Sequence, residues 1–150
     1  MTMQAVSVEP VRRSVTVGRS VEEAFALFTD GISTWWPFAS HSIGGEETTA
    51  AVFEPREGGR VYERLANGTE HDWADIVAWD PPRGFALAWH VNPERRTEVE
   101  VRFLPTEGGT RVELEHRGWE RLSEDVAAKS RENYSVGWEF VLGKYESAMR

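Results

Sequence analysis

The chain contains no cysteine among its 150 residues. This absence excludes a disulfide framework, a thiolate metal site and a cysteine nucleophile. The chain also has no apolar run that approaches the length of roughly 18 residues that a membrane-spanning helix needs. The first 14 residues show no apolar stretch of the kind found in signal peptides. From these absences we expect a cytoplasmic protein.

Positive charge is in short supply as well. The chain has 17 Lys and Arg against 25 Asp and Glu, giving a formal net charge of −8 and a pI of about 5.1. Nucleic acids and anionic membranes both attract basic patches, which an acidic chain of this size is poorly suited to present. We therefore predict that neither a nucleic acid nor a membrane is the partner.

The usual motifs of metal and phosphate chemistry are also missing. The histidines at 41, 71, 90 and 116 show no close pairing, and the acidic residues do not have the spacing of a calcium loop. No Gly-x-Ser-x-Gly elbow and no phosphate-binding loop is present. We predict no metal site and no cofactor.

Tryptophan, in contrast, is abundant, with seven residues in the chain. Trp35 and Trp36 are adjacent, and adjacent side chains of a regular helix or strand cannot both face one core. We expect one of them to pack inward and the other to line an opening. Large rigid aromatic side chains are typical of ligand cavities as well as of cores.

The hydrophobic pattern predicts one α+β domain over residues 1–150, with residues 1–8 loosely held. Ser20 to Glu23 has the form of a helix capping box, and a second short helical turn ends at Pro37. A long amphipathic helix begins near Ser123. The remaining segments have strand-like patterns with turn residues between them. These expected strands cover residues 9–17, 50–55, 60–65, 71–79, 85–91, 97–104 and 110–117.

These elements assemble in one simple way. Short hairpin connections give an antiparallel sheet, and the apolar stripe of the C-terminal helix needs one apolar sheet face to cover. A sheet of about six to seven strands twists and curls. We expect it to grip the long helix, with the two short helices after the first strand at its open end.

Several segments resemble one family, in order and over nearly the whole chain. They are SVEEAFALFTDGISTWWP (20–37), GGRVYER (58–64), Trp73 followed by IVAWDPPRGFALAW (76–89), TEVEVRFLPTEGGTRVELEHRGW (97–119) and GWEFVLGKY (137–145). In these segments the chain resembles bacterial AHSA-like proteins, named after the activator of the 90-kDa heat-shock protein ATPase. They belong to the START-like, or SRPBCC, superfamily with the helix-grip fold. The resemblance implies a hydrophobic cavity between the sheet and the C-terminal helix.

A cavity of this kind predicts a small hydrophobic or amphipathic molecule as the partner. Trp36, Trp73 and Trp138 are expected nearest to it. The full set of residues predicted to contact the ligand is Trp35, Trp36, Phe53, Glu63, Trp73, Trp89, Phe103, His116, Tyr134 and Trp138.

His116 and Glu63 are the two candidates for chemistry. Each alternates with apolar neighbours on its strand and so is expected to face inward. A buried histidine is either a hydrogen-bonded core residue or a polar group in the cavity, and a buried carboxylate must be paired. A direct Glu63–His116 contact would satisfy both groups and could serve as a general base with its partner.

Three functions stay open at this point. The first is non-enzymatic binding of a small molecule in the cavity. The second is a cyclase- or hydrolase-type enzyme that uses His116 and Glu63. The third is a chaperone-linked protein-interaction module, by analogy with the protein that gives the family its name. Members of such families often pair, so a homodimer is one arrangement that the sequence allows.

Overall fold

The computed structural model describes residues 9–149, so the prediction for residues 1–8 lies outside the described range. The helices and strands are β1 (Val11–Val17), α1 (Val21–Phe28), β2 (Thr48–Phe53), β3 (Arg60–Leu65), β4 (Glu70–Asp80), β5 (Gly84–Trp89), β6 (Thr97–Thr106), β7 (Gly109–Arg117) and α2 (Glu124–Ala148). Three short 3-10 turns join them, at Ile32–Thr34, Gly45–Glu47 and Trp119–Arg121.

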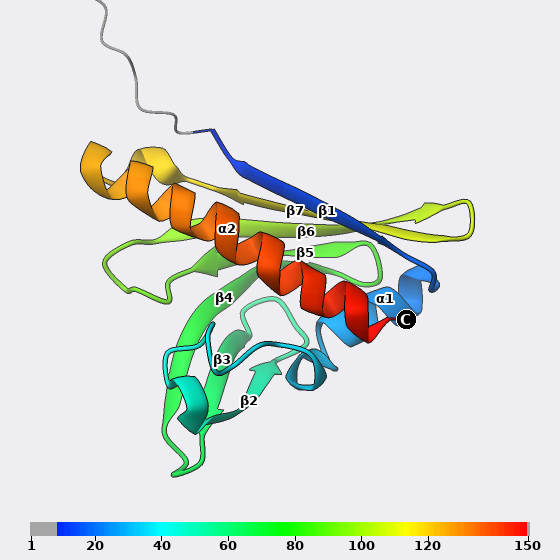
Figure 1. Ribbon diagram of the computed structural model, residues 1–150, viewed down its shortest axis with the longest axis horizontal. Coiled ribbons are helices and arrows are strands. Elements are labelled where there is room, and N and C mark those ends of the chain that lie inside the picture. Colours follow the sequence, from blue (N-terminus) through cyan, green and yellow to red (C-terminus); the bar gives the residue numbers. More distant parts are fainter. Residues whose placement is uncertain (1–8, 150) are drawn as a thin grey trace, which may run out of the picture.

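The seven strands form one antiparallel sheet in the order β1-β7-β6-β5-β4-β3-β2. Only β1 is out of sequence order, because it pairs with the last strand instead of the second. The sheet curls, and α2 runs across its inner side, as Figure 1 shows. The fold is therefore the predicted helix-grip arrangement.

Helix α1 begins where the capping box predicted. The Ser20 hydroxyl accepts a hydrogen bond from the Glu23 backbone N–H at 3.1 Å, which satisfies one of the free donors of the first turn. The helix buries Phe25 and Phe28 against Phe103 of β6, with ring centroids 5.2 and 5.8 Å apart. This aromatic cluster closes one end of the space between α2 and the sheet.

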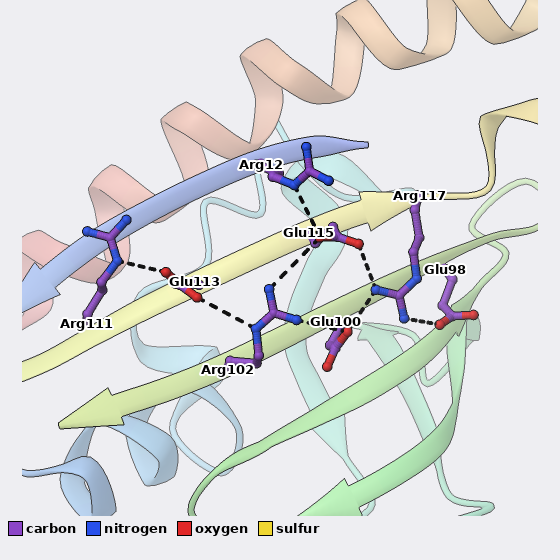
Figure 2. A network of polar contacts seen from close by, with 8 residues as sticks. All are labelled: Arg12, Glu98, Glu100, Arg102, Arg111, Glu113, Glu115 and Arg117. Atoms are coloured by element: carbon purple, nitrogen blue, oxygen red, sulfur yellow. Dashed lines mark hydrogen bonds and ion pairs between the residues drawn. The ribbon is translucent and has the colours of Figure 1, made fainter. Parts of the chain in front are cut away.

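Strands β6 and β7 alternate as their sequences predict. Val99, Val101 and Leu114 are buried on the inner face. The outer face carries linked ion pairs, in which Glu115 contacts Arg12 at 3.3 Å and Arg117 at 2.9 Å (Figure 2). The whole network comprises Arg12, Glu98, Glu100, Arg102, Arg111, Glu113, Glu115 and Arg117. Alternation thus separates an apolar core from a charged surface on the same two strands.

A hairpin turn at Asn67-Gly68 joins the antiparallel strands β3 and β4. Only Gly68 has a positive φ, at 90°. Asn67 keeps a negative φ, and its side-chain oxygen accepts a hydrogen bond from the Thr69 N–H at 2.9 Å. The asparagine side chain thus caps the turn, and the glycine alone takes the left-handed conformation.

Candidate ligand cavity

A cavity of about 220 Å³ lies between α2, the first part of β4, the end of β5 and the loop that follows α1. It contains no Asp, Glu, Lys or Arg side chain in its lining. The lining residues are Trp36, Ser40, His41, Ser42, Ile43, Trp73, Trp89, Val91, Tyr134, Gly137, Trp138 and Val141.

Four of the twelve lining residues are tryptophans. The ring centroids of Trp36 and Trp73 are 4.9 Å apart, and those of Trp73 and Trp89 are 6.3 Å apart. Trp138 from α2 completes the wall, at 5.5 Å from Trp89 and 6.0 Å from Trp36. Three different elements and one loop supply these side chains, so the wall exists only in the folded chain.

Each of these indoles has a hydrogen-bond partner for its N–H. Trp36 donates to the His41 carbonyl oxygen at 2.7 Å. The remaining three donate to side chains: Trp73 to Glu63 at 2.6 Å, Trp89 to Tyr134 at 3.0 Å, and Trp138 to His116 at 2.9 Å. Because the donors are already paired, the indoles present mainly apolar ring surface to the cavity.

Glu63 is fully buried and accepts four hydrogen bonds. Its carboxylate oxygens receive the backbone N–H groups of Ile43 and Gly44 and the Thr48 hydroxyl, each at 2.7 Å, in addition to the Trp73 indole. Burial raises the pKa of this carboxyl, but the four donors outweigh it and hold the pKa below its ordinary value. Glu63 therefore anchors the loop at the cavity mouth and one wall indole.

His116 is also fully buried, and both of its ring nitrogens are hydrogen-bonded. Its Nδ1 accepts from Trp138, so the ring proton is on Nε2 and is donated to the Thr97 hydroxyl at 2.7 Å. Burial lowers the pKa of His116 to about 3, which makes the ring neutral at neutral pH. Trp119 packs against the ring at a centroid distance of 4.4 Å.

The predicted Glu63–His116 contact is wrong. All four polar atoms of the two side chains are bonded to other partners, and no hydrogen bond joins the pair within residues 9–149. Neither residue is among those that line the cavity. Sequence alternation correctly placed both inward, but it could not tell which neighbours would satisfy them.

Tyr134 stands on α2 at the cavity wall. Its oxygen accepts the Trp89 N–H, and its ring lies 4.6 Å from that of His116. Burial raises the pKa of Tyr134 above its ordinary value, so the phenol is neutral at physiological pH.

The mouth of the cavity is formed by loop residues 40–43 facing Gly137 of α2. The Ser40 hydroxyl lies 2.6 Å from Nδ1 of His41, and the His41 ring stacks on Phe140 at 4.9 Å. A Cβ added at Gly137 would lie 3.9 Å from the His41 ring. A methyl group at this position would make ordinary van der Waals contact with the loop, so Gly137 faces the His41 ring directly.

Only some of the predicted ligand residues line the cavity. Five line the cavity: Trp36, Trp73, Trp89, Tyr134 and Trp138. Their contact with a ligand stays a prediction.

The others lie elsewhere. Trp35 is buried beside Phe28 and donates its N–H to the Leu27 carbonyl oxygen at 2.8 Å. Phe103 belongs to the cluster around α1, and Phe53 packs on Phe85 at 5.2 Å. None of the three is part of the cavity lining.

The mouth residues were missed by sequence reasoning. Ser40, His41, Ser42 and Ile43 lie in a loop without hydrophobic periodicity, and what places them is the buried carboxylate of a distant strand. An Asn-Gly pair or a capping box is a local sequence signal for a turn or a helix start, whereas this loop contains no such signal.

Within residues 9–149, no group of three or more His, Cys, Asp or Glu side chains could hold a metal ion. In the same range, no helix is long and apolar enough to cross a membrane.

A curled antiparallel sheet that grips a long C-terminal helix, with a cavity beneath the helix, defines the helix-grip class of α+β proteins. The model of the family described as "Activator of Hsp90 ATPase homolog 1-like protein" matches residues 19–149. The chain belongs to this family, as the resemblance predicted. A comparison with curated proteins finds no match.

Solved structures add three relatives. CalC from Micromonospora echinospora, described as a self-sacrificing resistance protein, is 28% identical, with 95% of this chain and 94% of that one covered and a TM-score of 0.72. Txn09, described as an anthrahydroquino-γ-pyrone synthase, is 41% identical over 73% of this chain and 77% of that one, with a TM-score of 0.56.

The third relative is the Aha1 dimer from Colwellia psychrerythraea. It is 19% identical, with 93% of this chain and 95% of that one covered and a TM-score of 0.66. At this level of identity the likeness concerns the fold alone.

Proposed function

We propose that this protein binds a small, neutral, largely aromatic molecule in the cavity between α2 and the sheet. The observation that carries the proposal is the wall of four indole rings with their N–H groups already paired. Flat apolar ring faces favour flat apolar ligands, through burial and stacking.

The charge and size of the site narrow the ligand class. No Asp, Glu, Lys or Arg lines the cavity, so a charged ligand would lose its hydration without gaining a partner. A cavity of about 150 Å³ in another protein holds one benzene ring. The volume of about 220 Å³ here suits roughly two fused rings, with room for more only through the mouth.

The relatives point in the same direction. One is described as a resistance protein and another as the synthase of an anthrahydroquino-γ-pyrone, a fused aromatic ring system. The likeness to the synthase favours a second candidate, a ring-forming enzyme. The pair His116 and Glu63, which the sequence suggested for chemistry, is not available for that reaction, because both side chains are fully hydrogen-bonded away from the cavity.

The third candidate, a chaperone-linked interaction module, has support only in the description of the family. An interaction module needs no internal cavity, so the cavity weighs toward small-molecule binding. A homodimer likewise remains a proposal by analogy with the dimeric relative.

Two glycines of α2 provide a matched test. Gly137 faces the mouth, whereas a Cβ at Gly143 meets no atom within 4 Å. We expect intrinsic tryptophan fluorescence to respond to the neutral two-ring compounds chromone and α-tetralone and much less to laurate. Gly137→Leu should weaken that binding at least about 10-fold by filling the mouth, a change of about 1.4 kcal/mol.

Gly143→Leu introduces the same side chain into the same helix and should leave binding unchanged. If the wild type responds to none of these compounds, or if the two variants lose binding equally, the cavity is not the binding site.

A further inference from the structure

The hydrogen bond between Trp89 and Tyr134 has a fixed direction. Trp89 of β5 and Tyr134 of α2 both line the cavity, and the indole nitrogen lies 3.0 Å from the phenol oxygen. An indole N–H can donate but cannot accept. The Tyr134 oxygen is therefore the acceptor of this bond.

The direction of that bond leaves the phenol hydrogen without a use. A phenol carries one donor in addition to its acceptor capacity. No hydrogen bond donated by Tyr134 is found within residues 9–149. The neighbouring His116 ring offers no acceptor, because Nδ1 receives Trp138 and Nε2 is paired with Thr97.

The Tyr134 hydroxyl therefore has a free donor at the wall of the cavity, whereas the N–H groups of the four wall indoles are all hydrogen-bonded. A ligand that fills the cavity displaces solvent from this donor, so the donor gains most from a ligand that supplies a partner for it. The hydroxyls of Ser40 and Ser42 lie on the loop at the mouth, and the Ser42 hydroxyl already donates to the Phe38 carbonyl oxygen at 2.6 Å.

We propose that Tyr134 is the polar anchor of the cavity and donates its hydroxyl hydrogen to a carbonyl or ether oxygen of a neutral aromatic ligand. This inference rests on the proposed function and deepens it, because it states which polar group the ligand carries. Trp89 is a positioning residue in this arrangement, since it occupies the phenol oxygen and so makes Tyr134 act as a donor.

The anchor gives the site a preference that shape alone does not provide. A ligand oxygen satisfies the phenol hydrogen, whereas a hydrocarbon of the same shape leaves it buried and unpaired. Sites built around a hydrogen bond reject the analogue that lacks the partner much more strongly than apolar pockets reject a change of size.

A pair of matched probes tests the proposal. α-Tetralone and tetralin have the same two-ring frame and differ by one carbonyl oxygen. We expect wild-type protein to bind α-tetralone at least about 10-fold more tightly than tetralin, as measured by isothermal titration calorimetry. Tyr134→Phe should reduce this ratio to near one, chiefly by weakening the binding of α-tetralone.

Tyr62→Phe is the control variant. Tyr62 is on β3, its hydroxyl accepts from Arg64 at 3.1 Å, and it does not line the cavity. It should keep the wild-type ratio. A second measurement needs no variant, because the infrared carbonyl stretch of bound α-tetralone should shift to lower frequency than in cyclohexane when the oxygen accepts a hydrogen bond.

The outcomes separate the anchor from the cavity. Equal weakening of both probes by Tyr134→Phe, or an unshifted carbonyl stretch in the wild type, overturns the anchor and leaves cavity binding intact. Failure of the wild type to bind either probe overturns the proposed function and the anchor together.

Discussion

At the scale of single residues, buried polar groups determine what the cavity offers. Glu63 and His116 look like catalytic candidates because they are ionisable side chains on inward faces. Their hydrogen bonds instead hold Trp73 and Trp138 in the wall. The two side chains therefore shape the site from behind and do not face a ligand.

Glu63→Gln tests this positioning role. The carboxylate accepts four donors, whereas an amide presents its own N–H₂ to some of them and leaves those donors unpaired. We expect the free energy of unfolding to fall by about 3 kcal/mol, as measured by urea denaturation. Glu107→Gln, in an exposed turn, is the control and should change it by less than about 0.5 kcal/mol.

The pH dependence of the same variant is a second readout. The folded-state pKa of Glu63 is lowered, so its stabilisation is present above the unfolded-state pKa of about 4.3 and is lost as pH falls through the folded-state value. Near pH 3 the difference between wild type and Glu63→Gln should therefore shrink. A difference that stays constant from pH 7 to pH 3 contradicts the role of the ionised carboxylate.

At the scale of elements, the corner after α1 assigns different roles to two adjacent tryptophans. Trp35 is buried with Phe28 and Tyr145, at centroid distances of 5.2 and 5.1 Å. Trp36 is half-buried, and its ring contributes to the cavity wall. The sequence predicted this division and expected Trp36 nearest to the cavity, although it also counted Trp35 among the residues that contact the ligand.

Trp36→Ala should reduce affinity for chromone more than it reduces stability. It removes a wall ring next to Trp73 and Trp138. Trp35→Ala, its matched control, should cost about 3–5 kcal/mol of unfolding free energy, because it leaves a hole in the core. Fluorescence titration and urea denaturation of both variants check this. If Trp36→Ala unfolds the protein as readily as Trp35→Ala, Trp36 is a core residue.

The elements also explain how much the sequence could predict. Alternation on β6 and β7 and the capping box at Ser20 are local signals, and the structure agrees with both. Loop 38–47 has no such signal, because its path depends on Glu63, some twenty residues further along the chain. Only half of the predicted ligand residues line the cavity. The sequence can indicate that an aromatic side chain faces inward, but packing decides whether it joins the core or the cavity wall.

At the scale of the whole molecule, charge and aromatic surface are separated by the sheet. The linked ion pairs drawn in Figure 2 lie on the outer face of β1, β6 and β7, while the cavity and the aromatic core lie between the sheet and α2. The net charge of −8 therefore says little about the ligand, because it belongs to surfaces that the ligand does not contact. Partially exposed ion pairs of this kind contribute little individually.

His116 links β6, β7 and α2, so its titration should affect the stability of the whole fold. Its folded-state pKa is lowered to about 3 by burial, against about 6.5 in the unfolded chain. Between these values the unfolded state binds a proton that the folded state does not. Unfolding therefore becomes easier as pH falls from about 6.5 to about 3, by about 1.4 kcal/mol per pH unit from this residue.

Replacing His116 with glutamine removes this titration while retaining polar atoms for Thr97 and Trp138. His116→Gln should be less stable than wild type at pH 7, because the smaller side chain packs less well against Trp119. Its unfolding free energy should nevertheless fall less steeply between pH 6.5 and pH 4.5, where few carboxylates titrate. His71→Gln, a partly exposed change on β4, should keep the wild-type slope. Urea denaturation at half-unit pH intervals measures all three slopes, and identical slopes for wild type and His116→Gln would mean that the buried ring is not the group that couples acid to unfolding.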